Sequence, residues 1–263
     1  MLTGHDIRLS LGRRPVLNGI SFTARAGEVT AVAGPNGSGK TTLLRTLTGE
    51  LRHQGQVMLN GRDIRHLAPV ELAALRGVLP QKTNLAFPFT ALEVVKIGQS
   101  FGIDQDPGLP RRALERVGML AFAERPYQVL SGGEQARVQL ARVLVQVWEP
   151  KRDGVPRWLF LDEPVASLDI GHQMQVMEIA CDFADQGGGV LAVMHDLNLT
   201  AMFADQVLLM TGGQIRAAGT PREVFTSANL SAAYGCPVAV STTPPPHLPF
   251  VLPHGVGPLA GAV

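Results

Sequence analysis

Gly34-Pro-Asn-Gly-Ser-Gly-Lys-Thr41 decides the fold of this chain, because it matches the pattern G-x-x-x-x-G-K-[ST] of a phosphate-binding loop. The loop follows Val29-Thr-Ala-Val-Ala33, which is typical of a buried strand, and residues 42–48 after it are typical of a helix. Glycines let backbone N–H groups surround phosphate oxygens at a helix N-terminus. A chance glycine turn would not require this strand–loop–helix context. The predicted phosphate-binding residues are Gly34, Pro35, Asn36, Gly37, Ser38, Gly39, Lys40, Thr41 and Thr42.

Four side chains predict chemistry on a nucleoside triphosphate. In this loop pattern Lys40 reaches the β- and γ-phosphates, and the Thr41 hydroxyl binds Mg²⁺. A pattern typical of a buried strand that ends in a carboxylate is found in Trp158-Leu-Phe-Leu-Asp162, and Glu163 follows directly. We expect Asp162 to orient the metal ion and Glu163 to act as general base toward the attacking water. The alternative for this acidic pair is a cap on the next element.

Composition limits the class of protein. Hydrophobic residues make up 45% of the 263 residues, enough for a large buried core. The 23 basic and 22 acidic residues nearly balance, which argues against a nucleic-acid binder that works by bulk charge. Two cysteines are too few for a disulfide framework. With no apolar run of about 18 residues and no apolar leader at the N-terminus, we expect a cytoplasmic chain that is not itself a membrane protein.

Short β-branched runs alternate with helical patterns, which predicts a layered α/β fold. From Thr90 to about Glu149 the pattern is helical only, with Thr90 and Glu93 as a capping box and Pro110 opening a second helix. A helical subdomain is therefore predicted between two α/β stretches. The last 27 residues contain seven prolines and predict an extended tail. The expected strands are residues 6–11, 20–24, 28–33, 56–59, 158–161, 190–194 and 207–210.

Leu130-Ser-Gly-Gly-Glu-Gln135 opens a long helix whose apolar stripe includes Leu140, Leu144, Val147 and Trp148. A Ser-Gly-Gly at a helix N-terminus is a second candidate anion site, and an ordinary N-cap is an equally good interpretation. One subunit needs only a single phosphate-binding site for its nucleotide. A second anion site, on an inserted subdomain, therefore needs another explanation.

At this point the sequence resembles the ATP-binding subunits of ABC transporters over about residues 3–240. Gly34 to Thr41 corresponds to the Walker A element, Trp158 to Glu163 to Walker B, and Leu130 to Gln135 to the family signature. Gln81 lies at the family's Q-loop, Ser167-Leu-Asp169 resembles the D-loop, and His195 resembles the switch histidine. Taken alone, His195 could equally be satisfied by Asp196 at a helix cap.

The resemblance implies a P-loop NTPase (RecA-like) core of α/β class, with an N-terminal antiparallel β subdomain and an inserted α-helical subdomain. The implied boundaries are 3–86 and 157–240 for the core, 87–156 for the helical subdomain and 241–263 for the tail. It also implies ATP and Mg²⁺ as cofactors, with Gln81 on the metal ion and the attacking water. His195 would hold the γ-phosphate.

The family resemblance further implies a head-to-tail homodimer. Ser131, Gly132, Gly133 and Glu134 of one subunit would close over the nucleotide of the other, and Asp169 would order the opposite site. Two transmembrane permease subunits are expected as partners, so the chain would lie peripherally on the cytoplasmic face of the membrane. Phe87, Pro88 and Phe89 form either an apolar socket for a permease helix or ordinary core.

Within the family, the chain is most similar to the ATPases of haem importers in the iron-siderophore and cobalamin group. The stretches that carry this are residues 79–81 with 85–90, the insert that begins at Trp148-Glu-Pro150, and 218–221 with 234–237. An indirect partner is then a periplasmic or surface haem-binding protein. Siderophore or cobalamin import remains the alternative, and a soluble non-transport ABC ATPase or a small-molecule kinase fits less well. His247 and His254 are interpreted as solvated tail residues.

One position departs from the family pattern. Many members carry an aromatic residue in the first strand's loop that stacks on adenine, whereas Leu11 occupies that place here. Arg13 or Arg14 could supply a cation–π contact to the base instead. Base recognition is therefore expected to be built differently in this chain.

Overall fold

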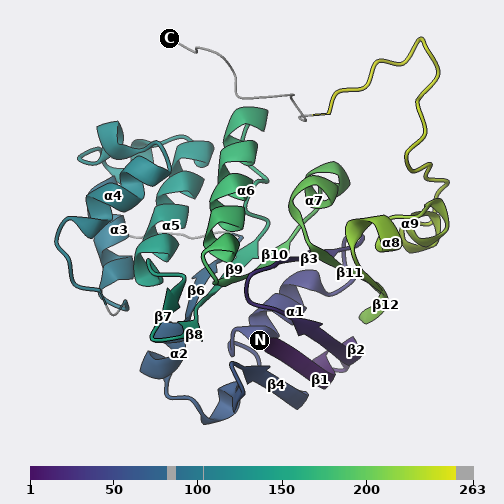
Figure 1. The fold of residues 1–263 in the computed structure, drawn as a ribbon, viewed down its shortest axis with the longest axis horizontal. Helices are drawn as coiled ribbons and strands as arrows, with labels where there is room; N and C mark the ends of the chain where they lie inside the picture. The colour runs from purple at the N-terminus through teal and green to yellow at the C-terminus, as the bar shows by residue number, and fades with distance from the viewer. Residues whose placement is uncertain (82–86, 103, 253–263) are drawn as a thin grey trace.

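The computed structural model describes residues 1–81, 87–102 and 104–252 of the chain. Its elements form layers around a six-stranded sheet, with α6 and α7 above it and a smaller antiparallel sheet below it (Figure 1). Helices α3, α4 and α5 form a group at one end, and α8 and α9 lie at the other. The α/β class expected from the alternating pattern is confirmed.

The six-stranded sheet has the order β12-β11-β3-β10-β9-β6. Strands β11, β3, β10, β9 and β6 pair in parallel, with β6 at one edge, and β12 is antiparallel at the other edge. Because parallel strands share one direction, their carboxyl ends meet at the same edge of the sheet, where ligands bind in such folds. The bounds are β3 Val29–Ala33, β6 Arg76–Leu79, β9 Trp158–Asp162, β10 Gly189–Val193, β11 Gln206–Thr211 and β12 Gln214–Gly219.

A four-stranded sheet of order β2-β1-β4-β5 covers one side of the core. Its strands are β1 Leu2–Leu11, β2 Arg14–Ala24, β4 Gln54–Leu59 and β5 Arg62–Asp63, followed by the short helices η1 Ile64–His66 and α2 Pro69–Leu75. Helix α1, Lys40–Leu47, begins directly after the phosphate loop and packs between the two sheets. The antiparallel sheet thereby brings the β1–β2 hairpin to the phosphate loop.

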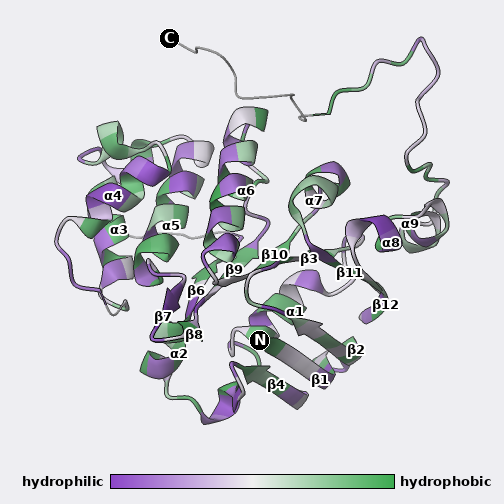
Figure 2. Ribbon diagram, viewed as in Figure 1, coloured by the Kyte–Doolittle hydropathy of each residue, from purple (hydrophilic) through white to green (hydrophobic). Residues whose placement is uncertain are grey.

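Strand β9 shows why the central sheet is buried on both faces. Trp158 and Phe160 pack into the cluster with α1 and the antiparallel sheet. Leu159 and Leu161 point to the other face, into the cluster with α5 and α6. Successive side chains of a strand alternate between faces, so a continuous apolar run fits a strand covered twice. In Figure 2, α5 and α6 carry both hydrophobic and hydrophilic turns, as expected for helices with one buried side.

The helical segment contains α3 Ala91–Gln99, α4 Leu109–Arg116 and α5 Gly132–Gln146, with the short helices η2 Leu120–Phe122 and η3 Tyr127–Val129 between the last two. The predicted capping box of α3 is confirmed, because Thr90 Oγ1 accepts from Glu93 N and Thr90 N donates to Glu93 Oε2. Pro110 lies in the first turn of α4, as predicted. Helix α5 ends at Gln146, so Val147 and Trp148 follow the helix and still pack on its core.

Several expected strands are longer in the structure, because strand pairing extends beyond the apolar stretch. Strand β1 begins at Leu2 and β2 at Arg14, and their ladder contains register shifts near Asp6, which has a φ of 46°. The insert before Arg157 forms a small hairpin of β7 Lys151–Arg152 and β8 Val155–Pro156. The remaining helices are α6 Ile170–Asp185, α7 Leu197–Phe203, α8 Pro221–Val224 and α9 Ser227–Tyr234.

The predicted tail is described to residue 252, and residues 241–252 contain no helix or strand. His254 and the rest of the tail lie outside the described residues. Before the tail, Val238 N donates to Ser231 Oγ and Val240 N donates to Ser227 Oγ. These bonds attach the chain to α9 up to Val240.

Candidate nucleotide-binding and catalytic site

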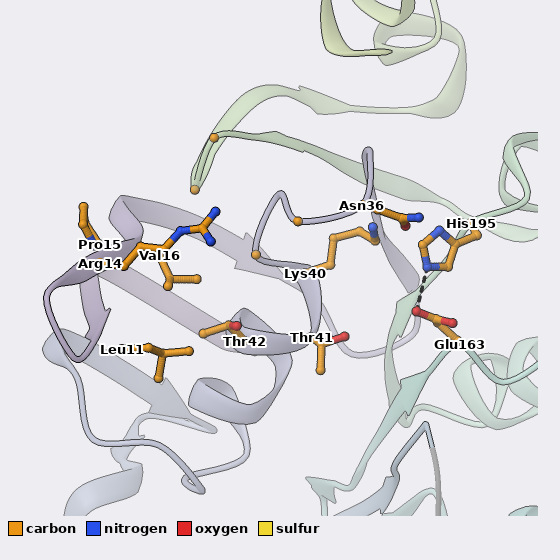
Figure 3. Close-up of a pocket in the computed structure, with 14 residues that line it drawn as sticks. Leu11, Arg14, Pro15, Val16, Asn36, Lys40, Thr41, Thr42, Glu163 and His195 are labelled. Atoms are coloured by element: carbon orange, nitrogen blue, oxygen red, sulfur yellow. Dashed lines mark hydrogen bonds and ion pairs between the residues drawn. The ribbon is translucent and has the colours of Figure 1, made fainter. Parts of the chain in front are cut away.

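A cavity of about 580 Å³ lies at the carboxyl edge of the central sheet (Figure 3). One end is formed by the β1–β2 hairpin and the other by Glu163 and His195. The phosphate loop and the start of α1 line its floor. Its lining residues are Leu11, Arg14, Pro15, Val16, Asn36, Gly37, Gly39, Lys40, Thr41, Thr42, Glu163, His195, Gly212 and Gly213.

The phosphate loop has the backbone that its glycines predict. Gly34 has a φ of 142°, and a Cβ there would lie 2.1 Å from the carbonyl oxygen of Met210. Gly39, with a φ of 101°, is the N-cap of α1, so the first N–H groups of that helix are free to bind an anion. The buried Ser38 hydroxyl has no hydrogen-bond partner in the described chain, which fits a group that a ligand satisfies.

Lys40 folds over the start of its own loop. Its Nζ donates to the carbonyl oxygens of Gly34, at 2.8 Å, and of Pro35, at 3.1 Å. Burial lowers the pKa of Lys40, and the Glu163 and Asp162 carboxylates oppose this shift. The side chain is only 5% exposed as a residue, so its charge acts in a poorly solvated place. A poorly solvated ammonium group interacts strongly with negatively charged phosphate oxygens.

Thr41 and Asp162 meet across the gap between α1 and β9. Thr41 Oγ1 donates to Asp162 Oδ1 at 3.1 Å. Burial raises the pKa of Asp162, and this hydrogen bond partly opposes the rise. A hydroxyl beside a carboxylate fits Mg²⁺, which binds few protein oxygens and shares the rest with phosphates and water.

Glu163 stands at the centre of a three-residue contact. Gln81 Nε2 donates to its Oε2 at 2.8 Å, and His195 Nε2 lies 2.6 Å from its Oε1. Glu163 has a φ of 54°, in the left-handed region that non-glycine residues rarely adopt. Backbone outliers of this kind cluster at functional sites, where the surroundings hold them. The ends of β6, β9 and β10 supply the three residues, because these strands are neighbours in the sheet.

His195 and Asp196 have separate roles in the structure. Asp196 caps α7 by accepting from Asn198 N and Leu199 N, whereas His195 contacts Glu163. The alternative in which Asp196 satisfies the histidine is therefore wrong.

The remaining predicted site residues gather in a second cavity, of about 380 Å³, which shares no lining residue with the first. Ser131 caps α5 in a capping box with Glu134. Asp169 caps α6 and accepts from His172 N at 3.0 Å and contacts His172 Nδ1 at 2.7 Å. Both interpretations of Ser131 thus remain compatible, since a capping serine can also face a ligand. The cavity is lined by Ser131, Gly132, Gly133, Glu134, Arg137, Ser167, Leu168, Asp169 and His172.

Sequence reasoning missed some lining residues. Gly212 and Gly213, in the turn between β11 and β12, close the first cavity, and a Cβ at Gly213 would lie 2.2 Å from the carbonyl oxygen of Val16. Their signal was a Gly-Gly pair after an apolar strand. His172 gave no signal, since its contact with Asp169 depends on the helix that begins there. Arg14 lines the cavity, whereas Arg13 does not.

The residues of the candidate permease socket differ in how exposed they are. Phe87 is 67% exposed, whereas Phe89 is partly buried and packs on the core of the helical segment. The stretch from Leu85 to Thr90 is described only from Phe87 onward, and its first two residues lie outside the described residues. No helix in the described part of the chain is long and apolar enough to cross a membrane.

The phosphate loop on a parallel sheet, with Glu163 at a strand end beside it, defines a P-loop nucleoside triphosphatase. The family model for ABC transporters matches residues 17–166. The chain is 58% identical over 255 residues to the Hemin import ATP-binding protein HmuV of Jannaschia sp. (strain CCS1), covering 97% of this chain and 94% of that protein. It is 57% identical over 259 residues to the protein of the same name from Roseobacter denitrificans, covering 98% and 99%. This chain belongs to the ATP-binding proteins of the ABC transporter family, which hydrolyse ATP to drive transport.

Solved structures show the same fold. An ATP-binding cassette of an ABC transporter in its ADP conformation aligns with a TM-score of 0.74 at 25% identity, covering 89% of this chain and 98% of that one. A component of the CbiONQ ABC transporter complex from Clostridium perfringens aligns with a TM-score of 0.72 at 27% identity, covering 88% and 92%. The expected fold, an α/β P-loop core with an antiparallel sheet and added helices, is confirmed.

Proposed function

We propose that this chain is the ATPase subunit of an importer for haem, and that Glu163 is the base that drives its hydrolysis. The transported compound is inferred from relatives named for hemin import, which are similar over nearly the whole chain. The catalytic role of Glu163 is supported by its carboxylate, which contacts Gln81 and His195. It lines the same cavity as Lys40 and the phosphate loop.

Each residue of the site has a different role in ATP hydrolysis. Lys40 and the loop N–H groups of residues 34–42 bind the phosphates, and Lys40 neutralises charge on the γ-phosphate. Glu163 accepts the proton of the attacking water. His195 keeps the Glu163 carboxylate in place and binds the γ-phosphate, while the Gln81 amide fixes the other carboxylate oxygen and orients the water. General-base action of this kind contributes about 10²- to 10⁴-fold to a rate.

Mg²⁺ would be held by Thr41, Asp162 and Gln81. Bound there, the ion would neutralise negative charge on the phosphates. The support from this chain is the hydroxyl–carboxylate pair of Thr41 and Asp162, whose oxygens are hard ligands in a mostly buried place.

Two copies of the chain would form the complete site. Ser131, Gly132, Gly133, Glu134 and Asp169 line a cavity separate from that of Lys40, so within one chain they do not line the phosphate cradle. In a head-to-tail homodimer each such cavity faces the partner's phosphate loop, and the free N–H groups at the start of α5 complete the γ-phosphate site.

The chain would also contact membrane proteins. ABC importers work with permease subunits, and we infer two transmembrane permeases here, with the chain peripheral on the cytoplasmic face.

The chain would divide into a core of residues 3–86 and 157–240, a helical subdomain of residues 87–156 and a tail of residues 241–263. The helical subdomain would bring Ser131 to the partner subunit. Phe87, which is exposed, is the candidate permease contact. A separate haem-binding protein would deliver the cargo.

The transported compound is tested by reconstituting the ATPase with its copurified permease in vesicles. Binding protein loaded with haem should stimulate ATP hydrolysis, and binding proteins loaded with siderophore or cobalamin should not. Stimulation by one of the latter alone would reassign the importer without changing the ATPase site.

A further inference from the structure

Tyr234 is the last residue of α9, the helix that lies beside β11 and β12 (Figure 1). Residues 234–237 are among the stretches that resemble haem importers, but none of them is among the described residues that line the first cavity. Tyr234 packs against an apolar cluster that contains Ala33 and residues of β11, α8 and α9. Ala33 ends β3 and directly precedes the phosphate loop. The C-terminal helix therefore packs where the phosphate loop begins.

Gly34, the first residue of the loop, is contacted from three elements. Burial raises the pKa of the Tyr234 hydroxyl, and a hydrogen bond from the Gly34 N–H to this hydroxyl opposes the rise. The Gly34 carbonyl oxygen accepts from Lys40 Nζ at 2.8 Å. Met210 of β11 closes the remaining side, where its carbonyl leaves no space for a Cβ. Gly34 thus connects the Tyr234 hydroxyl with the Lys40 ammonium group.

Helix α9 is itself fixed at both ends. Thr226 caps its start, and Gly235 ends it in the left-handed conformation, with a φ of 70°. Beyond this turn the chain returns to the helix, where Val238 N donates to Ser231 Oγ at 2.9 Å. Caps at both ends satisfy the free backbone groups of a short helix. The Tyr234 side chain therefore extends from a well-anchored support.

We propose that Tyr234 is a positioning residue of the phosphate loop, which fixes Gly34 and, through the Gly34 carbonyl, the resting position of Lys40. The inference rests on the proposed nucleotide site and adds a residue that prepares this site for phosphate. Because Tyr234 is not among the described lining residues of the first cavity, its hydroxyl acts through the loop rather than on the nucleotide. A loop that is already ordered loses less conformational freedom when phosphate binds, which increases the affinity.

The chain has two tyrosines, and the other one supplies a matched control. Tyr127 lies in the helical segment, where its hydroxyl accepts from Gln139 Nε2 at 3.0 Å. Tyr234→Phe and Tyr127→Phe each remove one hydroxyl from one hydrogen bond. Tyr234→Phe should weaken the binding of both ADP and inorganic pyrophosphate, with Mg²⁺, by about fivefold, the size of one hydrogen bond. Tyr127→Phe should bind both probes as wild type does. Competition with a fluorescent nucleotide measures the affinities, and the thermal midpoints of the two variants should be similar.

A second measurement follows the Tyr234 side chain directly. In Tyr127→Phe it is the only tyrosine left, and inorganic pyrophosphate does not absorb in the near ultraviolet. Binding of pyrophosphate with Mg²⁺ should change the absorption of this tyrosine, because the phosphate-bound loop alters the hydrogen bond at Gly34. The double variant Tyr127→Phe/Tyr234→Phe should lack the signal, which separates it from changes at the tryptophans.

Wild-type affinity of Tyr234→Phe for both probes would overturn the inference. An equal loss of affinity in Tyr127→Phe would also overturn it, because the effect would then be general destabilisation. Weaker ADP binding with unchanged pyrophosphate binding would overturn it as well, since Tyr234 would then act on the nucleoside and not on the loop. If wild type bound neither probe, the proposed nucleotide site itself would fail, and the inference with it.

Discussion

His195 Nε2 lies 2.6 Å from Glu163 Oε1, although 32 positions separate the two residues in the chain. The contact exists because β9 and β10 are parallel neighbours, with Asp162 in register with Val193. Glu163 N donates to Val193 O at 3.1 Å as the chain leaves β9. The left-handed backbone of Glu163 then turns its carboxylate toward the histidine. The position of the candidate base is thus set by two strand ends.

Glu163→Gln should keep ATP binding and lower the hydrolysis rate by about 10²- to 10⁴-fold, because an amide cannot accept the proton of water at neutral pH. The shape of the side chain is retained, so Gln81 and His195 keep a partner. Phosphate release and equilibrium nucleotide binding measure the two effects. We also expect the variant to accumulate an ATP-bound dimer.

A matched control is Glu178→Gln, the same change at an exposed position on α6. It should hydrolyse ATP at the wild-type rate. Near wild-type turnover in Glu163→Gln would remove Glu163 from the role of general base.

The head-to-tail dimer predicts complementation between two inactive variants. Lys40→Ala removes the phosphate lysine, and Ser131→Arg blocks the start of α5 and its cap. Each homodimer should be nearly inactive. In a mixed dimer, one site combines an intact Lys40 with an intact Ser131, so mixing the two purified variants should restore part of the turnover.

Complementation is measured as ATPase activity across a range of mixing ratios, with a maximum expected near equal amounts. Activity that only adds the two residual rates would mean that both residues act within one chain. Circular dichroism of each variant checks that neither has unfolded, since loss of the cap alone costs about 1 kcal/mol.

Gly98→Ala should destabilise the helical segment. A Cβ at Gly98 in α3 would lie 1.9 Å from the carbonyl oxygen of Arg142 in α5, so the two helices would have to separate. Overpacking of this kind costs about 2 kcal/mol, which corresponds to a fall of about 4–8 °C in the thermal midpoint. Gly171→Ala makes the same change in α6, where the nearest atom is 3.7 Å away, and should be close to neutral. Equal midpoints for the two variants would contradict the close approach of α3 and α5.

The two cysteines should differ in reactivity. Burial raises the pKa of Cys181 to about 11, so at pH 8 only about one thiol in a thousand is the reactive thiolate. Cys236 is exposed. A colorimetric thiol reagent should modify Cys236 quickly and Cys181 slowly. Raising the pH toward 11 should speed the modification of Cys181, because a thiol with a raised pKa becomes charged only there. The Cys236→Ser variant isolates Cys181, and fast labelling of that variant at pH 8 would contradict its burial.

Local sequence predicted the parts of the site that lie on one continuous segment. The phosphate loop, the capping box at Thr90, the N-cap at Ser131 and the acidic pair after β9 depend on neighbours within a few residues. Strand ends were less predictable. Strand β2 begins at Arg14, well before its apolar stretch, because pairing with β1 continues to the hairpin turn.

By itself, the sequence determined that the chain has a phosphate cradle at Gly34 to Thr41, a carboxylate strand end at Asp162 and Glu163, and a capped helix at Ser131. These features arise from hydrogen bonds and periodicity within short segments. Only the tertiary structure decided that Gln81 and His195 both contact Glu163, that Arg14 rather than Arg13 lines the cavity, and that Ser131 faces a different cavity. Such contacts depend on the order of strands in a sheet and on the turn of a hairpin, which bring together residues that have no local relationship in the chain.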